Sequence, residues 1–195
     1  MNLPNKLTTL RMILVPVMVV LFYIGAISPI CYILATATFI VAAFTDFLDG
    51  HIARKYNLVT DFGKFMDPLA DKALVLVALI LIVDKGIGSV ADSYSILAYV
   101  APVSLIVMLI RELVVSGLRL VGANKGVVIA ADKLGKIKTV TQDVSLPILL
   151  LSYYFESKTF AVMQHVGLAI LFVAGIVSVI SGIYYLVKNK ELLKG

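Results

Sequence analysis

Apolar residues dominate six long stretches of the chain, and polar residues collect between them. The stretches run over residues 9–27, 30–55, 67–83, 94–120, 137–155 and 160–187. A helix needs roughly 20 apolar residues to cross the hydrocarbon core of a membrane. The pattern therefore predicts an all-α integral membrane protein with six transmembrane helices and a short N-terminal interfacial segment. We expect residues 1–195 to form a single transmembrane domain.

The composition excludes a soluble globular protein. Hydrophobic residues make up 61% of the chain, whereas soluble domains contain about 45–50%. Too little polar surface would remain to face water. Cys31, the one cysteine, lies in an apolar stretch and has no partner for an intrachain disulfide.

The basic residues predict the orientation of the helices. If the N-terminus is cytoplasmic, all of the 17 lysines and arginines except Lys85 and Lys158 fall on the cytoplasmic side. Six spans then place both termini there, in agreement with the positive-inside rule. Lys125 and Lys138 are interpreted as anchors of this kind. Anionic lipid head groups explain the net charge of +5, so no nucleic acid partner is required.

Four aspartates lie where the second and third predicted spans meet the cytoplasmic face. Asp46 and Asp49 are three residues apart and Asp67 and Asp71 are four apart, so each pair shares one face of a helix. A charge at the bilayer centre costs about 2.5–3.5 kcal/mol on insertion scales, so we expect these acids to be hydrated or bound to metal. Clustered carboxylates are ligands for Mg²⁺ or Mn²⁺, which suit phosphate chemistry.

Small residues accompany the aspartates at helical spacing. Gly50, Ala53 and Gly63 each lie four residues from one of them. Without bulk they would let a flat nucleotide approach the helix backbones, and Arg54 could reach a phosphate. A simpler interpretation stands for Asp67, which precedes Pro68 as an N-cap residue does.

The complete motif resembles a family signature. Its residues are Asp46-Phe-Leu-Asp49-Gly50-His-Ile-Ala53-Arg54 and, eight residues later, Gly63-Lys-Phe-Met-Asp67-Pro-Leu-Ala-Asp71. They match every position of the CDP-alcohol phosphotransferase signature, D-x-x-D-G-x-x-A-R-x8-G-x-x-x-D-x-x-x-D. The resemblance implies a transferase that takes a phosphatidyl group from a CDP-activated lipid.

The resemblance also implies roles for individual residues. A site for two divalent metal ions would be formed by Asp46, Asp49, Asp67 and Asp71. Asp71 would in addition be the general base. The CDP moiety would contact Asp46, Gly50, Ala53, Arg54 and Gly63. We further expect a homodimer in the bacterial cytoplasmic membrane, with the active site facing the cytoplasm.

A basic cluster marks a candidate site for the acceptor. Arg111 and Arg119 lie eight residues apart at the end of the fourth predicted span, and Lys133 and Lys136 follow in the next loop. Such a cluster could hold the phosphate of an anionic acceptor, or merely anchor the helices.

The sequence contains two further patterns besides the Arg-Glu-x6-Arg pattern of this cluster. One is the opening Asn-Leu-Pro-Asn-x-Leu-Thr-x-x-Arg, and the other is the later Lys-x-Lys-Thr-x-x-Gln. Together they resemble the branch of the family whose acceptor is sn-glycerol 3-phosphate. The implied products are phosphatidylglycerol phosphate and CMP.

Other functions stay open from the sequence alone. The same family also includes enzymes that use inositol phosphate, serine or a phospholipid as acceptor. A membrane prenyltransferase would require two separated aspartate motifs. A divalent-metal transporter would place acids near the middle of several spans, whereas Asp143 lies near the basic end of its span.

Overall fold

The computed structural model describes residues 2–55, 60–86, 99–127, 129, 133–155 and 157–190. Within these residues the chain forms six α-helices, which are α1 (Leu3–Ile24), α2 (Ile30–Lys55), α3 (Asp61–Asp84), α4 (Val100–Asn124), α5 (Lys133–Ser152) and α6 (Ser157–Lys188). They coincide with the six predicted stretches. The largest differences are at three helix starts. Helices α1 and α3 begin earlier than the apolar pattern predicts, and α4 begins later.

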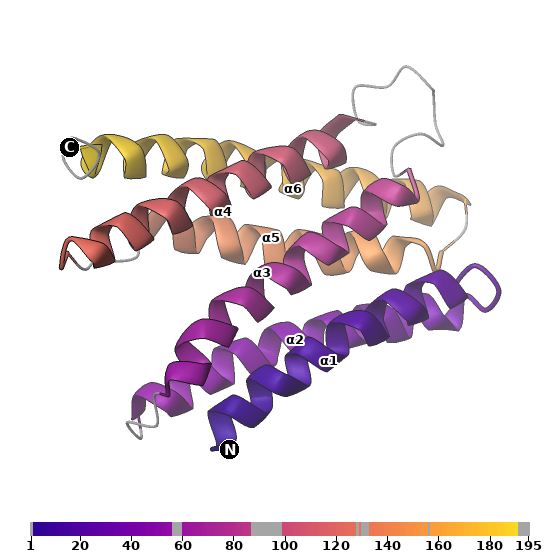
Figure 1. Ribbon diagram of the computed structural model, residues 1–195. Helices are drawn as coiled ribbons and strands as arrows, with labels where there is room; N and C mark the ends of the chain where they lie inside the picture. Colours follow the sequence, from indigo (N-terminus) through magenta and orange to yellow (C-terminus); the bar gives the residue numbers. More distant parts are fainter. Residues whose placement is uncertain are drawn as a thin grey trace.

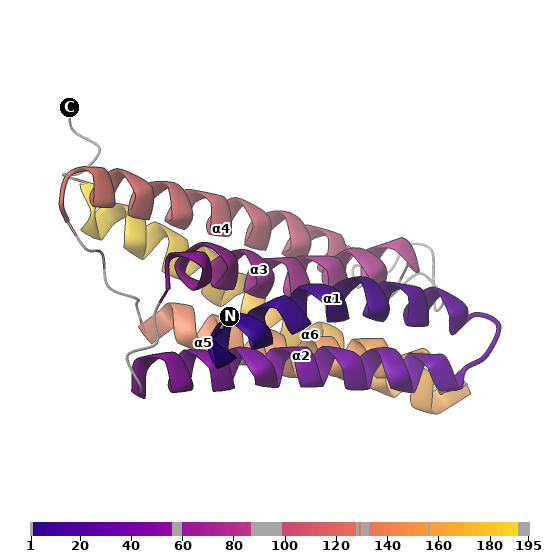
Figure 2. The same cartoon turned by 60° about the horizontal axis from the view of Figure 1, so that its bottom comes forward.

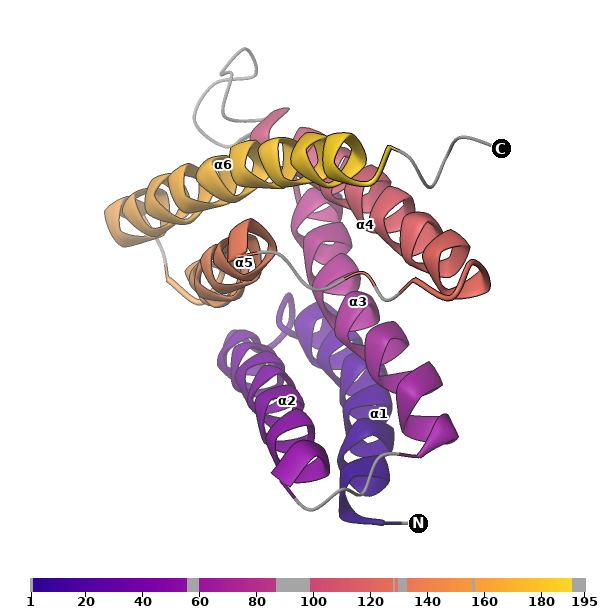
Figure 3. The ribbon, with the colours of Figure 1, turned by 90° about the vertical axis from the view of Figure 1, so that its left-hand side faces the viewer.

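Helix α3 lies at the centre of the bundle. Helices α1 and α2 pack side by side below it, and α4, α5 and α6 form a group above it (Figure 1). Viewed end-on in Figure 3, α3 lies between these two groups, and it contacts α1, α2, α4 and α5. Residues on α3 are therefore within reach of most of the other helices.

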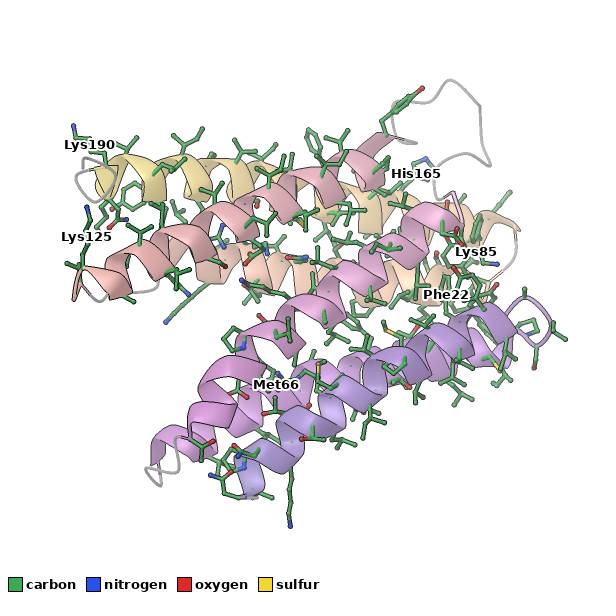
Figure 4. The ribbon with its side chains drawn as sticks, in the orientation of Figure 1. Phe22, Met66, Lys85, Lys125, His165 and Lys190 are labelled. Carbon is green, nitrogen blue, oxygen red and sulfur yellow. The ribbon has the colours of Figure 1, made fainter. Side chains whose placement is uncertain are left out.

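The helices run back and forth along one direction. The start of α1 and the end of α6 lie at the same end of the bundle, and the α1–α2 turn lies at the other (Figures 1 and 2). Figure 4 shows Lys125 and Lys190 at the first end and Lys85 at the opposite end, near Phe22. This is the arrangement of basic residues on which the predicted orientation rests.

The length and composition of the helices fit a membrane. Three of the described helices, Leu3–Ile24, Val100–Ala123 and Lys158–Lys188, are long and apolar enough to cross one, and Ile30–Asp46 is a shorter apolar helix. Large apolar side chains such as Ile13, Val103 and Ile180 are more than half exposed, as is expected of residues that face lipid. The chain is thus an integral membrane protein, and the number of six spans stays a prediction.

One apolar core joins all six helices. Each contributes a side chain with almost no exposed surface, as shown by Phe22, Phe39, Leu79, Met108, Leu149 and Leu171. At the end away from the termini, the Phe22 ring packs edge-on against Tyr32 and Tyr153, with ring centroids 5.3 and 5.2 Å apart. The core fixes the helices against one another and so fixes the polar end described below.

The first helix begins earlier than its apolar stretch because polar residues form its first turn. The Asn2 side chain accepts a hydrogen bond of 3.1 Å from the Asn5 backbone N–H, and Pro4 lies in the first turn. Both features are typical helix starts. Asn5 and Thr8 lie inside the helix. The expected interfacial segment is therefore the first turn of α1.

The third helix also begins before its apolar stretch. The Thr60 hydroxyl accepts a hydrogen bond of 3.1 Å from the Gly63 backbone N–H, so Thr60 is the N-cap. The interpretation of Asp67 as the cap is wrong, because α3 already contains Asp67 and Pro68. The Asp67 side chain is instead available for a contact between helices.

Replacing Thr60 by alanine should lower the free energy of unfolding by about 1 kcal/mol, the usual value of an N-cap. The same hydroxyl donates a 2.8 Å hydrogen bond to Asn5 Oδ1, which joins α3 to α1. The measurement is thermal unfolding of the purified protein in detergent. Thr38→Ala is the matched control, since the Thr38 hydroxyl is exposed and bonds only to Leu34 O within its own helix. Equal unfolding temperatures of Thr60→Ala and Thr38→Ala would contradict this role of Thr60.

Candidate active site

Helix α1 is joined to both helices that carry the aspartate motif. The Thr8 hydroxyl donates a 2.5 Å hydrogen bond to Asp67 Oδ1 on α3. One turn later, Arg11 Nη1 lies 2.6 Å from Asp46 Oδ1 on α2, and Arg11 Nε donates to Ala42 O at 3.3 Å. Thr8 and Arg11 are three residues apart and so share one face of α1. This face brings an acid from each half of the motif to the same helix.

Arg11 forms its ion pair from a buried position. The Arg11 side chain is 0% exposed, whereas that of Asp46 is 42% exposed. A guanidinium removed from water needs compensating partners, and here Asp46 provides an ion pair and the Ala42 carbonyl accepts a hydrogen bond. The Asp46 carboxylate is therefore held from its buried side while its other side faces outward.

Asp71 lies within the electrostatic field of this group and of the basic helices. Among the described residues, the charges of Asp46, Arg11, Lys138 and Glu112 act on its carboxylate. Asp143 on α5 interacts in turn with Asp71, Lys138 and Asp46. The structure thus brings acids from α2, α3 and α5 into one neighbourhood at the polar end of the bundle. No spacing in the sequence relates Asp143 to the aspartate motif, so its place in this group is visible only in the structure.

Gly63 has a packing role at this place. It is buried, and a Cβ atom there would lie 3.3 Å from both Asn5 Oδ1 and Thr60 Oγ1 and 3.6 Å from Asp67 Oδ2. The absence of a side chain allows the start of α3 to approach α1 closely. A contact of Gly63 with a nucleotide stays a prediction. The structure gives no surroundings for Gly50 and does not describe the side chains of Asp49, Ala53 and Arg54, so their contacts with a nucleotide stay predictions as well.

The chemistry of these side chains fits a hard divalent cation. The donors are carboxylate oxygens, the preferred ligands of Mg²⁺ and Mn²⁺. Among the residues that the structure describes, no three His, Cys, Asp or Glu side chains form a compact metal-binding group. Asp49, the remaining carboxylate of the motif, is not among them. Convergence of all four aspartates on metal therefore stays a prediction.

A second charged cluster joins α3, α4 and α5. Its centre is Glu112, whose Oε1 lies 2.9 Å from Arg111 Nη1 and 3.0 Å from Lys138 Nζ. Lys72 Nζ lies 3.9 Å from Glu112 Oε2 and also donates to the Ser116 hydroxyl. Lys72 follows Asp71 directly in the sequence, so this cluster adjoins the acidic one.

Arg111 and Arg119, two of the four residues predicted to hold the acceptor, have different partners in the structure. Arg111 belongs to the Glu112 cluster. Arg119 Nε instead donates to Tyr185 Oη at 3.1 Å, and the guanidinium lies 5.9 Å from the centroid of that ring. Lys136 is exposed, and the Lys133 side chain lies outside the described residues. A common acceptor site for all four stays a prediction.

Sequence reasoning missed several of these contacts. Lys138 was interpreted as a surface anchor, but it is only 5% exposed and pairs with Glu112. Lys72, Arg11 and Thr8 were given no part in the site. One signal was available for Lys72, because a lysine beside a motif aspartate needs an anionic partner in a membrane. The partners of Thr8 and Arg11 are on other helices, and no local spacing indicates them.

Comparison with known proteins identifies a family. The sequence model of CDP-alcohol phosphatidyltransferases matches residues 1–183. A Bacillus subtilis (strain 168) protein is 42% identical over 205 residues, covering 99% of this chain and 97% of the relative. A Rickettsia bellii protein is 39% identical, covering 94% and 93%, and a Shigella flexneri serotype 5b protein is 36% identical, covering 95% and 93%. All three are named CDP-diacylglycerol–glycerol-3-phosphate 3-phosphatidyltransferase.

Proposed function

Because the chain belongs to the CDP-alcohol phosphatidyltransferase family, we propose that it transfers the phosphatidyl group of CDP-diacylglycerol to sn-glycerol 3-phosphate. The products are phosphatidylglycerol phosphate and CMP, so the enzyme acts in phospholipid biosynthesis. One observation carries the proposal, the near full-length similarity to relatives named for this reaction. The complete aspartate motif, from Asp46 to Asp71, supports it.

The reaction begins with proton transfer to Asp71. Its carboxylate accepts the proton of the sn-1 hydroxyl of glycerol 3-phosphate, and the hydroxyl oxygen attacks the phosphorus nearest the diacylglycerol. The bond from this phosphorus to the bridging oxygen breaks, and CMP leaves with the electron pair. The half-buried position of Asp71 among charges from α1, α2, α4 and α5 supports this assignment.

Divalent-metal dependence is a general property of the family. We assign two ions, Mg²⁺ or Mn²⁺, to Asp46, Asp49, Asp67 and Asp71. When bound, such ions neutralise the charge that develops on a diphosphate as it is cleaved. Thr8 and Arg11 orient Asp67 and Asp46 from the α1 side. The CDP moiety lies along Asp46, Gly50, Ala53, Arg54 and Gly63.

The acceptor phosphate binds among the basic residues of α4 and α5, with Arg111, Arg119, Lys133 and Lys136 as the assigned contacts. We place this end of the bundle at the cytoplasmic face of the bacterial membrane. The location of Lys125 and Lys190 at that end, opposite Lys85, supports the orientation (Figure 4). The donor then enters with its acyl chains in lipid and its nucleotide in the cytoplasm. A homodimer is also proposed.

The decisive experiment is an acceptor panel with the purified protein, CDP-diacylglycerol and radiolabelled acceptors. We expect label from glycerol 3-phosphate to enter lipid with stoichiometric release of CMP, and chelation of divalent metal to stop both. Preference for inositol phosphate, serine or a phospholipid would overturn the assigned acceptor. Metal flux into liposomes without CMP release would overturn the proposed enzymatic function.

Replacing Arg119 by alanine should raise the KM for glycerol 3-phosphate by about tenfold or more, because a charged contact to phosphate is lost. The KM for the lipid donor should change much less. Steady-state kinetics with each substrate varied in turn measure both values. Tyr185→Phe is the matched control, since it removes only the hydroxyl that accepts from Arg119. An unchanged acceptor KM in Arg119→Ala would mean that the acceptor phosphate is held elsewhere.

A further inference from the structure

The Glu112 cluster gathers cations from three helices around one carboxylate. In the part of the chain that the structure describes, Lys72, Arg111 and Lys138 are the basic side chains paired with Glu112. The side chains of Arg111, Lys138 and Glu112 are 12%, 6% and 19% exposed, and that of Lys72 is 31% exposed. These charges are therefore largely removed from water, and their mutual interactions are strong.

The cluster has an excess of positive charge. Three cations face the Glu112 carboxylate, so these four side chains together carry a net charge of +2, and the Asp71 and Asp143 carboxylates also interact with Lys138. Partly buried charges of one sign destabilise a protein unless a counter-ion compensates them. A phosphate monoester carries nearly two negative charges at neutral pH, so it would neutralise the cluster.

The packing around Arg111 fixes its guanidinium. Arg111 Nη2 donates to the Ser181 hydroxyl at 2.9 Å. A Cβ atom at Gly135 would lie 3.1 Å from Nη2, and one at Gly182 would lie 3.3 Å from Arg111 Cγ. Two glycines therefore provide the space that this side chain occupies. Arg111 Nε is buried and has no hydrogen-bond partner among the described residues, so within that part of the chain the cluster still holds an unused donor.

The cluster also adjoins the site of chemistry. Lys72 follows Asp71 in the sequence, and the charges of Lys138 and Glu112 both act on the Asp71 carboxylate. A phosphate bound by these cations would place the rest of a small acceptor molecule next to Asp71. The requirement for a nearby hydroxyl fits glycerol 3-phosphate, whose hydroxyl and phosphate are on one short carbon chain.

From this geometry we propose that Glu112 is a positioning residue, which holds Lys72, Arg111 and Lys138 as one site for the acceptor phosphate. The proposal rests on the function proposed above and adds Lys72 and Lys138 to the acceptor site. The carboxylate needs both its charge and its length, because it contacts α3, α4 and α5 at once. Without it the three cations would repel one another and lose their common geometry.

The test compares Glu112→Gln, which removes the charge, with Glu112→Asp, which keeps the charge and shortens the side chain. We expect both variants to raise the KM for glycerol 3-phosphate by about tenfold or more, the effect of losing a partly buried charge partner. The KM for CDP-diacylglycerol should stay within about twofold. Asp84→Asn is the matched control, since Asp84 bonds to Tyr23 at the other end of α3.

A second measurement separates positioning from simple repulsion of anions. Inorganic phosphate should inhibit the wild-type enzyme in competition with glycerol 3-phosphate, and this inhibition should weaken in Glu112→Gln. Tighter inhibition in that variant would overturn the proposal, because Glu112 would then only oppose anion binding. An unchanged acceptor KM, or equal rises in both KM values, would overturn it as well. A different preferred acceptor in the wild type would instead defeat the proposed function.

Discussion

Asp71→Asn is expected to lower the turnover number by about a hundredfold to ten-thousandfold, the usual contribution of a general base. Asparagine keeps nearly the same shape but cannot accept the proton of the acceptor hydroxyl. Binding of the nucleotide part of the donor should persist, because it depends mainly on other residues of the motif. Single-turnover CMP release measures the chemical step, and titration with a CDP-lipid measures binding.

Asp143→Asn is the informative companion to this variant. Asp143 lies on α5, half-buried and within the electrostatic field of Asp71, so it is another acid of this neighbourhood that could accept a proton. If Asp71 is the base, Asp143→Asn should cause a much smaller loss than Asp71→Asn. The reverse order would move the role of base to Asp143, and normal turnover in Asp71→Asn would exclude Asp71 from it.

Local spacing accounts for what could be predicted from the sequence. The length of the apolar stretches predicted six helices, because a helix needs roughly 20 apolar residues to cross a membrane. The separations of Asp46 from Asp49 and of Asp67 from Asp71 placed each pair on one helical face. The family identified from that motif is confirmed by the match over residues 1–183.

The contacts that the sequence did not reveal are those between helices. Thr8 meets Asp67 across 59 positions of sequence, and no property of either residue specifies the other. Lys138 looked like a surface anchor because its neighbours are basic, yet its side chain is buried and reaches from α5 to Glu112 on α4. The helix starts were misplaced for a related reason, since Asn2 and Thr60 cap their helices outside the apolar stretches.

The ion pair between Arg11 and Asp46 leads to the second large effect. Arg11→Met should lower kcat/KM by about tenfold to a hundredfold, as is usual when a residue that orients a metal ligand is removed. Methionine fills a similar volume without a charge. Removing one partner of an ion pair is strongly destabilising when the other charge is left buried, but the Asp46 side chain is 42% exposed and can be hydrated. The variant should therefore fold normally and react slowly.

The dependence of rate on Mg²⁺ concentration distinguishes orientation of Asp46 from simple helix packing. If Arg11 orients Asp46, the concentration for half-maximal activity should rise in Arg11→Met. In Arg11→Lys this concentration should lie between the values for the wild type and for Arg11→Met. An ammonium keeps the charge near Asp46, but it lacks the second fixed N–H that Arg11 donates to the Ala42 carbonyl. Thermal unfolding of each variant reports packing separately. A destabilised Arg11→Met with wild-type metal dependence would show that Arg11 serves only to join α1 to α2, and the role of α1 in the active site would then rest on Thr8 and Asp67 alone.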